Sequence, residues 1–145
     1  MSDELAEIDE KILRELERDG RASVAVIAER VHISRAQAYA RIKRLTDEGV
    51  ILGYGVRVDP GKRGLRSSAY VTLNVDQRHW QHIRDAIGRI PEVKHIALVG
   101  GEFDVLLLVR ARDNQDLRRV VLGELQGIEH VSSSKTLLIF EDHGL

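Results

Sequence analysis

The sequence predicts an α+β protein with two domains, and three observations lead to that prediction. Apolar residues near the N-terminus recur at helical spacing, whereas the second half alternates β-rich and helical segments. Between the two patterns, residues 59–66 are rich in turn formers and basic residues, which indicates a linker. We therefore expect a winged helix-turn-helix domain over 1–58 and a ferredoxin-like βαββαβ domain over 67–145.

Composition limits the classes of protein that this chain can belong to. The 145 residues include no cysteine, which excludes disulfide frameworks, cysteine-zinc sites and thiol catalysis. The acidic N-terminus does not resemble a signal peptide, and no apolar run approaches the roughly 20 residues of a membrane span. We expect a cytoplasmic protein with no membrane partner. The net charge is −1, so any nucleic-acid partner must be argued from how the charge is distributed.

Three helices are expected in the first domain. The first ends near Gly20, and Ser23 is the expected N-cap of the second. Ser34, followed three residues later by Gln37, has the spacing of a capping box and predicts a third helix from about Arg35 to Glu48. The apolar residues of the first helix lie on one face: Leu5, Ile8, Ile12, Leu13 and Leu16.

The third helix has a basic outer face. Residues 30–46 contain five Arg or Lys and no Asp or Glu. A short helix, a tight turn at His32-Ile33 and a second helix with a basic face form the unit that reads a DNA major groove. The next segment, 50–58, is rich in β-formers but interrupted by Gly53 and Gly55, and we interpret it as a strand or a wing-like extension.

The second half has the order strand, helix, strand, strand, helix, strand. The expected strands are 68–75, 93–99, 103–110 and 131–140. The first expected helix is ended by Pro91, and the second covers about 114–125. Two helices then cover one face of the sheet, but the strands are apolar on both faces, as in Ile96–Val99. A second copy stacked on the uncovered face is the simplest solution, so we predict a homodimer and a DNA site with two-fold symmetry.

Short motifs spread over nearly the whole chain carry a family resemblance through their order and spacing: Ile8-Asp9, Ile12-Leu13, Asp19-Gly20-Arg21, Ile33-Ser34, Arg41, Arg44-Leu45, Glu48-Gly49-Val50-Ile51, Gly53-Tyr54, Pro91-Glu92-Val93 and Gly101-Glu102-Phe103-Asp104. With these motifs the chain resembles the Lrp/AsnC (leucine-responsive, or feast/famine) family of prokaryotic transcription regulators. The resemblance implies DNA binding, dimers that assemble up to octamers, and an amino acid or related metabolite as effector. Arg35 stands where the family commonly has proline, and Ala40-Arg41 where it often has two arginines, so the operator sequence does not carry over.

Candidate DNA contacts lie along the third helix. Arg41, Lys43 and Arg44 are expected to reach phosphates or guanine edges, since arginine offers two donors to guanine. Residues near the helix start are positioned to read base edges, although Tyr39 has packing against the first helix as an alternative. The predicted set is Ser34, Arg35, Gln37, Tyr39, Arg41, Lys43 and Arg44.

The family resemblance implies an effector site near the hairpin Gly100–Asp104. Glu102 and Asp104 would accept from an ammonium group, and the backbone N–H groups of Gly100 and Gly101 would meet a carboxylate. Phe103 is equally compatible with a lid and with a core residue. Ser132, Ser133 and Ser134 would add hydroxyl groups. As a pattern, the glycine pair also fits an ordinary hairpin turn.

Other functions are less well supported by the sequence. No nucleophile elbow or phosphate-binding glycine loop occurs, so we expect neither catalytic residues nor a cofactor. His79 and His82 have a possible metal-ligand spacing but no evident third ligand, so no metal site is predicted. An RNA-binding sheet would need stacking aromatics, but 93–99 has none and 103–110 has only Phe103. The alternative left open is a small-molecule-binding or enzymatic ferredoxin-like module whose helical half mediates assembly.

Overall fold

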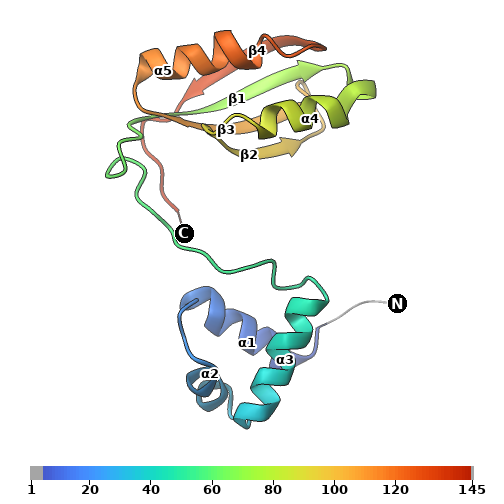
Figure 1. Cartoon of the computed structure of the whole chain (residues 1–145), viewed down its shortest axis with the longest axis vertical. Coiled ribbons are helices and arrows are strands. Elements are labelled where there is room, and N and C mark those ends of the chain that lie inside the picture. The colour runs from blue at the N-terminus through green and yellow to red at the C-terminus, as the bar shows by residue number, and fades with distance from the viewer. Residues whose placement is uncertain (1–4, 145) are drawn as a thin grey trace. The chain divides into compact units, whose positions relative to one another are not determined.

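The computed structural model describes residues 5–144, which form two compact units that divide between Arg57 and Val58 (Figure 1). The first unit is helical and the second combines a sheet with helices, as an α+β protein requires. Over 5–144, no helix combines the length and the apolar character needed to cross a membrane.

Three helices make up the first unit: α1 (Glu7–Arg18), α2 (Val24–Val31) and α3 (Arg35–Asp47). The Ser23 hydroxyl accepts a hydrogen bond from the Val26 N–H, which confirms the predicted N-cap of α2. At α3, both hydrogen bonds of the predicted capping box between Ser34 and Gln37 are present. These caps satisfy N–H groups that have no partner within the helix. All three helices contribute to one core, whose buried members are Ile12, Ile27, Val31 and Leu45.

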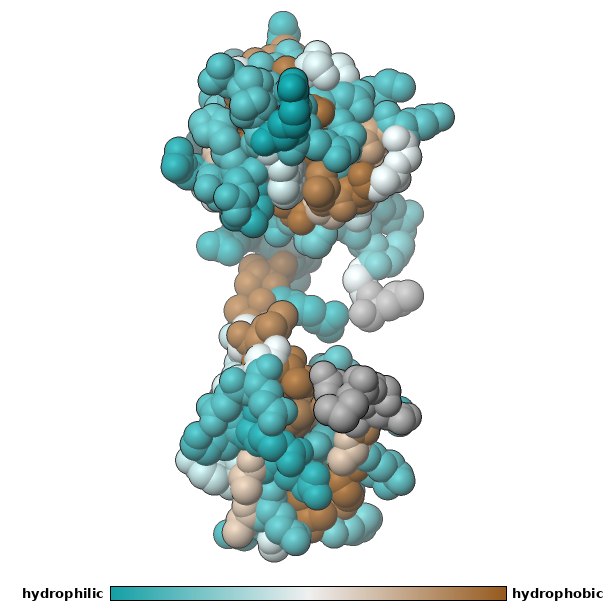
Figure 2. All heavy atoms as spheres, turned by 90° about the vertical axis from the view of Figure 1, so that its right-hand side faces the viewer, coloured by the Kyte–Doolittle hydropathy of each residue, from teal (hydrophilic) through white to brown (hydrophobic). Residues whose placement is uncertain are grey.

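Segment 50–58 was expected to be a strand or a wing-like extension, and the first of these alternatives is wrong, because no strand is found there. The segment is extended, but a strand exists only where its backbone is hydrogen-bonded to a neighbour, and residues 5–144 offer it none. Ile51 packs against the core of the first unit, but the apolar side chains further along are uncovered, with Leu52 95% and Val56 84% exposed. Figure 2 shows this as brown residues along the connecting segment.

The second unit contains a four-stranded antiparallel sheet in the order β2-β3-β1-β4. This confirms the predicted ferredoxin-like arrangement. The elements are β1 (Ser67–Val75), the 3-10 turn η1 (Gln77–His79), α4 (Trp80–Gly88), β2 (Val93–Leu98), β3 (Val105–Ala111), α5 (Asn114–Arg118), η2 (Arg119–Leu125) and β4 (Val131–Leu138). The last helix differs from expectation, because it continues beyond Arg118 as a π-helix, η2.

The helices pack against one face of the sheet and leave the other open (Figure 1). Val71 and Leu107 belong to the covered face and pack in the same core as Ile83 of α4 and Val120 of η2. On the open face, Tyr70 of β1 lies between Leu108 of β3 and Leu137 of β4 in the strand register. Tyr70 and Leu137 are 41% and 56% exposed, so this face presents apolar residues to solvent.

Candidate DNA-binding and ligand-binding sites

The outer face of α3 carries several of the predicted DNA contacts. Arg35, Gln37 and Tyr39 follow the capping serine and are exposed, so the alternative in which Tyr39 packs on α1 is not realised. Lys43 lies further along and donates to Asp47 over 2.5 Å, with both side chains more than half exposed. An exposed pair of this kind contributes little stability, so Lys43 can exchange Asp47 for a phosphate.

Arg41 and Arg44 are committed to a second role that the sequence did not reveal. Asp9 of α1 is 1% exposed, and its two carboxylate oxygens accept from Arg41 Nη1 at 3.0 Å and Arg44 Nη2 at 2.5 Å. A buried carboxylate is stable only when it is paired, so these ion pairs fix α3 on α1. Arg44 remains half exposed and keeps other N–H groups free, but its removal disturbs the fold as well as any DNA contact.

The capping box limits what Gln37 can do. Its Oε1 atom accepts from the Ser34 N–H at 3.2 Å, and the Ser34 hydroxyl accepts from the Gln37 N–H at 3.1 Å. Reading adenine with both ends of the amide requires a free oxygen and a free amino group. While the cap is formed, Gln37 therefore has only its amino group to offer.

In the second unit, a hollow of about 120 Å³ lies at one end of the open sheet face. It gathers four of the predicted effector residues: Glu102, Phe103, Ser133 and Ser134. It also contains three polar residues that the sequence analysis missed: Thr72, Asn74 and Lys135. Thr72 and Lys135 are direct partners in the β1–β4 register, a proximity that only the strand pairing reveals.

The hollow brings both charges and an aromatic ring together. Lys135 is a cation and Glu102 an anion, and both side chains are exposed, whereas the Phe103 ring is half-buried. Asn74 Nδ2 donates to the Ser133 hydroxyl at 2.8 Å, which holds the end of β1 to β4. Such a set can bind a small molecule that carries a carboxylate, an ammonium group and an apolar part.

Asp104 has a structural role that competes with the predicted one. Its carboxylate accepts from the Val75 N–H and from Gln77 Nε2, both at 2.9 Å. These hydrogen bonds, the backbone one most of all, hold the pKa of Asp104 below its ordinary value. Both oxygens are already engaged, which leaves Glu102 as the carboxylate free to accept from a ligand.

The remaining predicted effector residues lie outside the residues that line the hollow. Gly100 and Gly101 belong to the turn between β2 and β3, and Gly101 has a φ of 131°, which favours glycine. The Ser132 hydroxyl donates to the Asn74 carbonyl oxygen at 3.0 Å. These residues shape the end of the sheet around the hollow.

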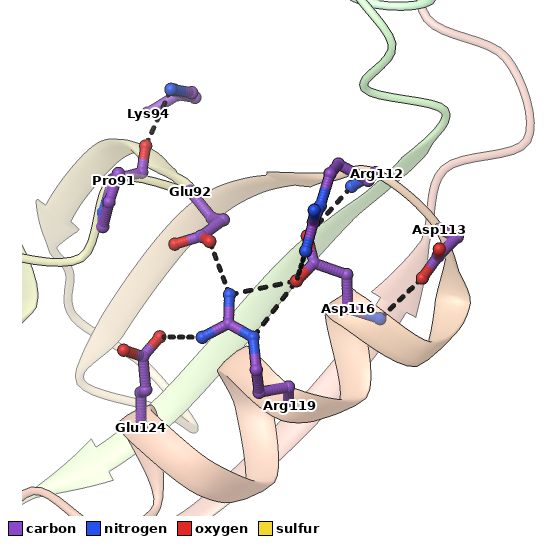
Figure 3. A network of polar contacts seen from close by, with 8 residues as sticks. All are labelled: Pro91, Glu92, Lys94, Arg112, Asp113, Asp116, Arg119 and Glu124. Carbon is purple, nitrogen blue, oxygen red and sulfur yellow. Dashed lines mark hydrogen bonds and ion pairs between the residues drawn. The ribbon is translucent and has the colours of Figure 1, made fainter.

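A second polar region of the same unit is built from ion pairs between its own residues (Figure 3). The Asp116 carboxylate, on a residue that is 6% exposed, accepts from the Arg112 N–H at 3.1 Å and from Arg119 Nη2 at 3.0 Å. Arg119 also reaches Glu92 at 2.6 Å and Glu124 at 3.1 Å. These contacts hold the pKa of Asp116 at about 2, chiefly through the backbone N–H of Arg112. Because the cations are already paired, this region braces α5 against the sheet.

The fold and these two sites define a DNA-binding regulator with a separate small-molecule-binding domain. Residues 5–51 match the family model for winged helix-turn-helix DNA-binding domains, and residues 68–143 match that for the Lrp/AsnC ligand-binding domain. The chain therefore belongs to the Lrp/AsnC family of transcriptional regulators.

Individual relatives match over nearly the whole chain. A proline dehydrogenase transcriptional activator of Rhizobium radiobacter is 33% identical over 97% of this chain and 92% of its own length. The regulator AldR of Mycolicibacterium smegmatis is 34% identical over 95% of this chain and 82% of its own. In fold, the chain is similar to a Neisseria meningitidis transcriptional regulator solved with L-Met, with a TM-score of 0.90, 24% identity and coverage of 98% and 94%. These relatives are regulators, which disfavours the enzymatic alternative.

Proposed function

We propose that the protein regulates transcription in response to an amino acid, which binds the hollow formed by Glu102, Phe103 and Lys135. The observation that carries this proposal is that a cation, an anion and an aromatic ring line one hollow, and that neither charge forms an ion pair with another residue of 5–144. Lys135 pairs with the α-carboxylate, Glu102 accepts from the α-ammonium group, and Phe103 contacts the side chain. The L-Met complex of the similar regulator supports an amino acid as the class of ligand.

DNA binds to the outer face of α3. Arg35, Tyr39 and the amino group of Gln37 contact base edges, while Lys43 contacts a phosphate. Ser34 contributes indirectly, because its capping box with Gln37 fixes the N-terminal end of α3 that faces the DNA. Arg41 and the half-exposed Arg44 hold the helix on Asp9, and the remaining N–H groups of Arg44 contact the backbone of the DNA.

The working form is a homodimer that buries the open face of the sheet. The exposed apolar residues of that face, with Tyr70 and Leu137 at its centre, support a second copy as its cover. Since Thr72 and Lys135 belong to the same face, dimer formation would narrow the hollow around the ligand. Further assembly of dimers to octamers is the expectation from the family. Two copies of α3 would then bind a two-fold symmetric DNA site.

The test is fluorescence anisotropy with the duplex upstream of the protein's own gene, with and without pooled amino acids. The wild-type protein should bind the duplex, and the pool should change its Kd several-fold. Lys135→Ala should bind the duplex equally well but lose the response to the pool, and Glu102→Gln should do the same. Lys94→Ala is the matched control, because it removes an exposed lysine of the same sheet outside the hollow.

Two results would contradict the proposal in different ways. A normal response of Lys135→Ala and Glu102→Gln to the pool would show that the ligand binds elsewhere. A wild-type protein that binds no duplex sequence, while it still binds amino acids, would contradict the role of α3 as the DNA-reading element.

A further inference from the structure

Two histidines that lie far apart in the sequence meet in the second unit. His79 ends η1, and His130 lies in the turn before β4. Their imidazole rings are parallel to within 2° and their centroids are 3.6 Å apart. His82, which the sequence had paired with His79 at helical spacing, does not belong to this cluster.

Asp76 adds a carboxylate to the two imidazoles. One potential ligand atom from each of Asp76, His79 and His130 lies within 4.8 Å of the other two. Zinc ligands at bond lengths of about 2.1 Å in a tetrahedral site lie roughly 3.4 Å apart. The three groups therefore need side-chain movements on the order of an ångström, in which the rings turn out of their stack toward a common point.

The backbone holds these three residues together independently of their side chains. The Asp76 N–H donates to the His130 carbonyl oxygen at 2.9 Å, and the His79 N–H donates to the Asp76 carbonyl oxygen at 3.0 Å. His130 has a φ of 72°, a conformation that few residues other than glycine adopt. His130 thus keeps a positive φ while its ring lies against that of His79.

Asp76 accepts from the Arg78 backbone N–H through Oδ1 at 3.1 Å, a cap that a metal ion on the other oxygen leaves in place, and its guanidinium partner is weak enough for a metal ion to displace. Arg78 reaches the Asp76 carboxylate through Nε at 3.0 Å and Nη2 at 2.8 Å, but the Arg78 side chain is 86% exposed. An ion pair this exposed is screened by water and contributes little. A divalent cation held by two imidazoles therefore competes well for the carboxylate.

We propose that Asp76, His79 and His130 form a binding site for a late first-row divalent metal ion such as Zn²⁺, Ni²⁺, Co²⁺ or Cu²⁺. Two imidazoles and one carboxylate match the nitrogen and oxygen ligands that these ions take, and water completes the coordination. The ion ties the end of β1 to the turn before β4. This is also where Asn74 pairs with Ser133 beside the hollow. The metal site itself does not depend on the proposed function.

Trp80 provides a direct probe of this site. It is the only tryptophan of the chain and it follows His79 directly. In the full-length protein, Cu²⁺ or Ni²⁺ bound at the site should quench its fluorescence at micromolar concentrations, and excess Zn²⁺ should restore the signal by displacing the quencher. Isothermal titration with Zn²⁺ gives the affinity independently of the fluorescence.

The variants identify the ligands one at a time. His79→Ala and Asp76→Asn should each weaken Zn²⁺ binding by tenfold or more. His130→Asn should do the same, and it retains the backbone because asparagine tolerates a positive φ. His82→Ala is the matched control and should leave the affinity unchanged. Arg78→Ala removes the competing guanidinium and should tighten binding, by up to about fivefold.

Several outcomes would overturn the proposal. One is wild-type protein that binds none of these ions below millimolar concentration. Another is His82→Ala losing affinity while His130→Asn does not, which would assign binding to the helical His79–His82 pair. A third is unchanged affinity in Asp76→Asn. Circular dichroism of each metal-free variant separates a loss of ligands from a loss of fold.

Discussion

Each unit of the molecule contains a buried aspartate that accepts hydrogen bonds from two arginines, and the two clusters have different roles. Asp9 joins α1 to α3 and accepts from Arg41 and Arg44, which lie on the helix that we assign to DNA. Asp116 accepts from Arg112 and Arg119, which lie close to it in the sequence, and this cluster braces α5. The same chemistry thus positions a functional surface in one unit and supports a sheet in the other.

A basic residue on a recognition helix is therefore not necessarily a DNA contact. Arg44 and Lys43 are neighbours, and both were predicted to reach DNA. Arg44 pairs with a carboxylate that is 1% exposed, whereas Lys43 pairs with an exposed one. Loss of Arg44 therefore tests the fold and DNA binding together, whereas loss of Lys43 tests DNA binding alone.

The largest expected effect follows from removing the charge of Asp9. Asp9→Asn leaves two arginines without their partner between α1 and α3, so it should lower the free energy of unfolding of the first unit by about 3 kcal/mol. Urea unfolding followed by circular dichroism measures this loss. Asp47→Asn removes an exposed carboxylate from α3 and should change stability by less than about 0.5 kcal/mol. Equal losses in the two variants would contradict the role assigned to Asp9.

Asp116→Asn should have a smaller effect, of about 2 kcal/mol, on the second unit. The reason is that Arg119 retains Glu92 and Glu124 when Asp116 loses its charge. Urea unfolding monitored by Trp80 fluorescence, which reports on the second unit alone, measures this loss. A loss larger than that of Asp9→Asn would reverse the order that the two clusters predict.

Acid should reduce the contribution of Asp116 in a defined pH range. Its pKa falls from the ordinary 3.8 to about 2 in the folded state, so the unfolded chain takes up the proton first as pH falls. The stabilisation is complete above the unfolded pKa and is lost between about pH 4 and about pH 2. Urea midpoints of wild type and Asp116→Asn should therefore lie closer together at about pH 3 than at about pH 6. A gap that does not change with pH would contradict this.

Lys43→Ala should have the smallest effect on stability and a clear effect on DNA. One phosphate contact contributes about 1 to the slope of log K against log salt, so the slope should fall by about that amount. Anisotropy titrations at several salt concentrations measure it. Lys11→Ala removes an exposed lysine with the same i, i+4 pairing from α1 and serves as the matched control. If both variants give the same slope, Lys43 does not contact a phosphate.

Features set by local sequence were predictable, whereas features set by distant contacts were not. The Ser34 capping box, the helices of the first unit and the succession of strands and helices in the second unit followed from spacing and periodicity. The Asp9 cluster requires α1 and α3 to cross, and no short pattern encodes that. The same holds for Lys135 beside Thr72, which depends on strand register, and for His79 beside His130. At 50–58 the residues favour a strand, but residues 5–144 supply no neighbouring strand for it to pair with.

An amino acid in the second unit and DNA on α3 should affect each other's binding. The most direct measurement uses the amino acid that shifts DNA affinity most, with its own Kd determined for the free protein and for the protein saturated with duplex. Thermodynamic linkage requires that DNA changes the Kd for the amino acid by the same factor as the amino acid changes the Kd for DNA. We predict that this factor is roughly five or more. An amino-acid Kd that is identical with and without DNA would contradict the account.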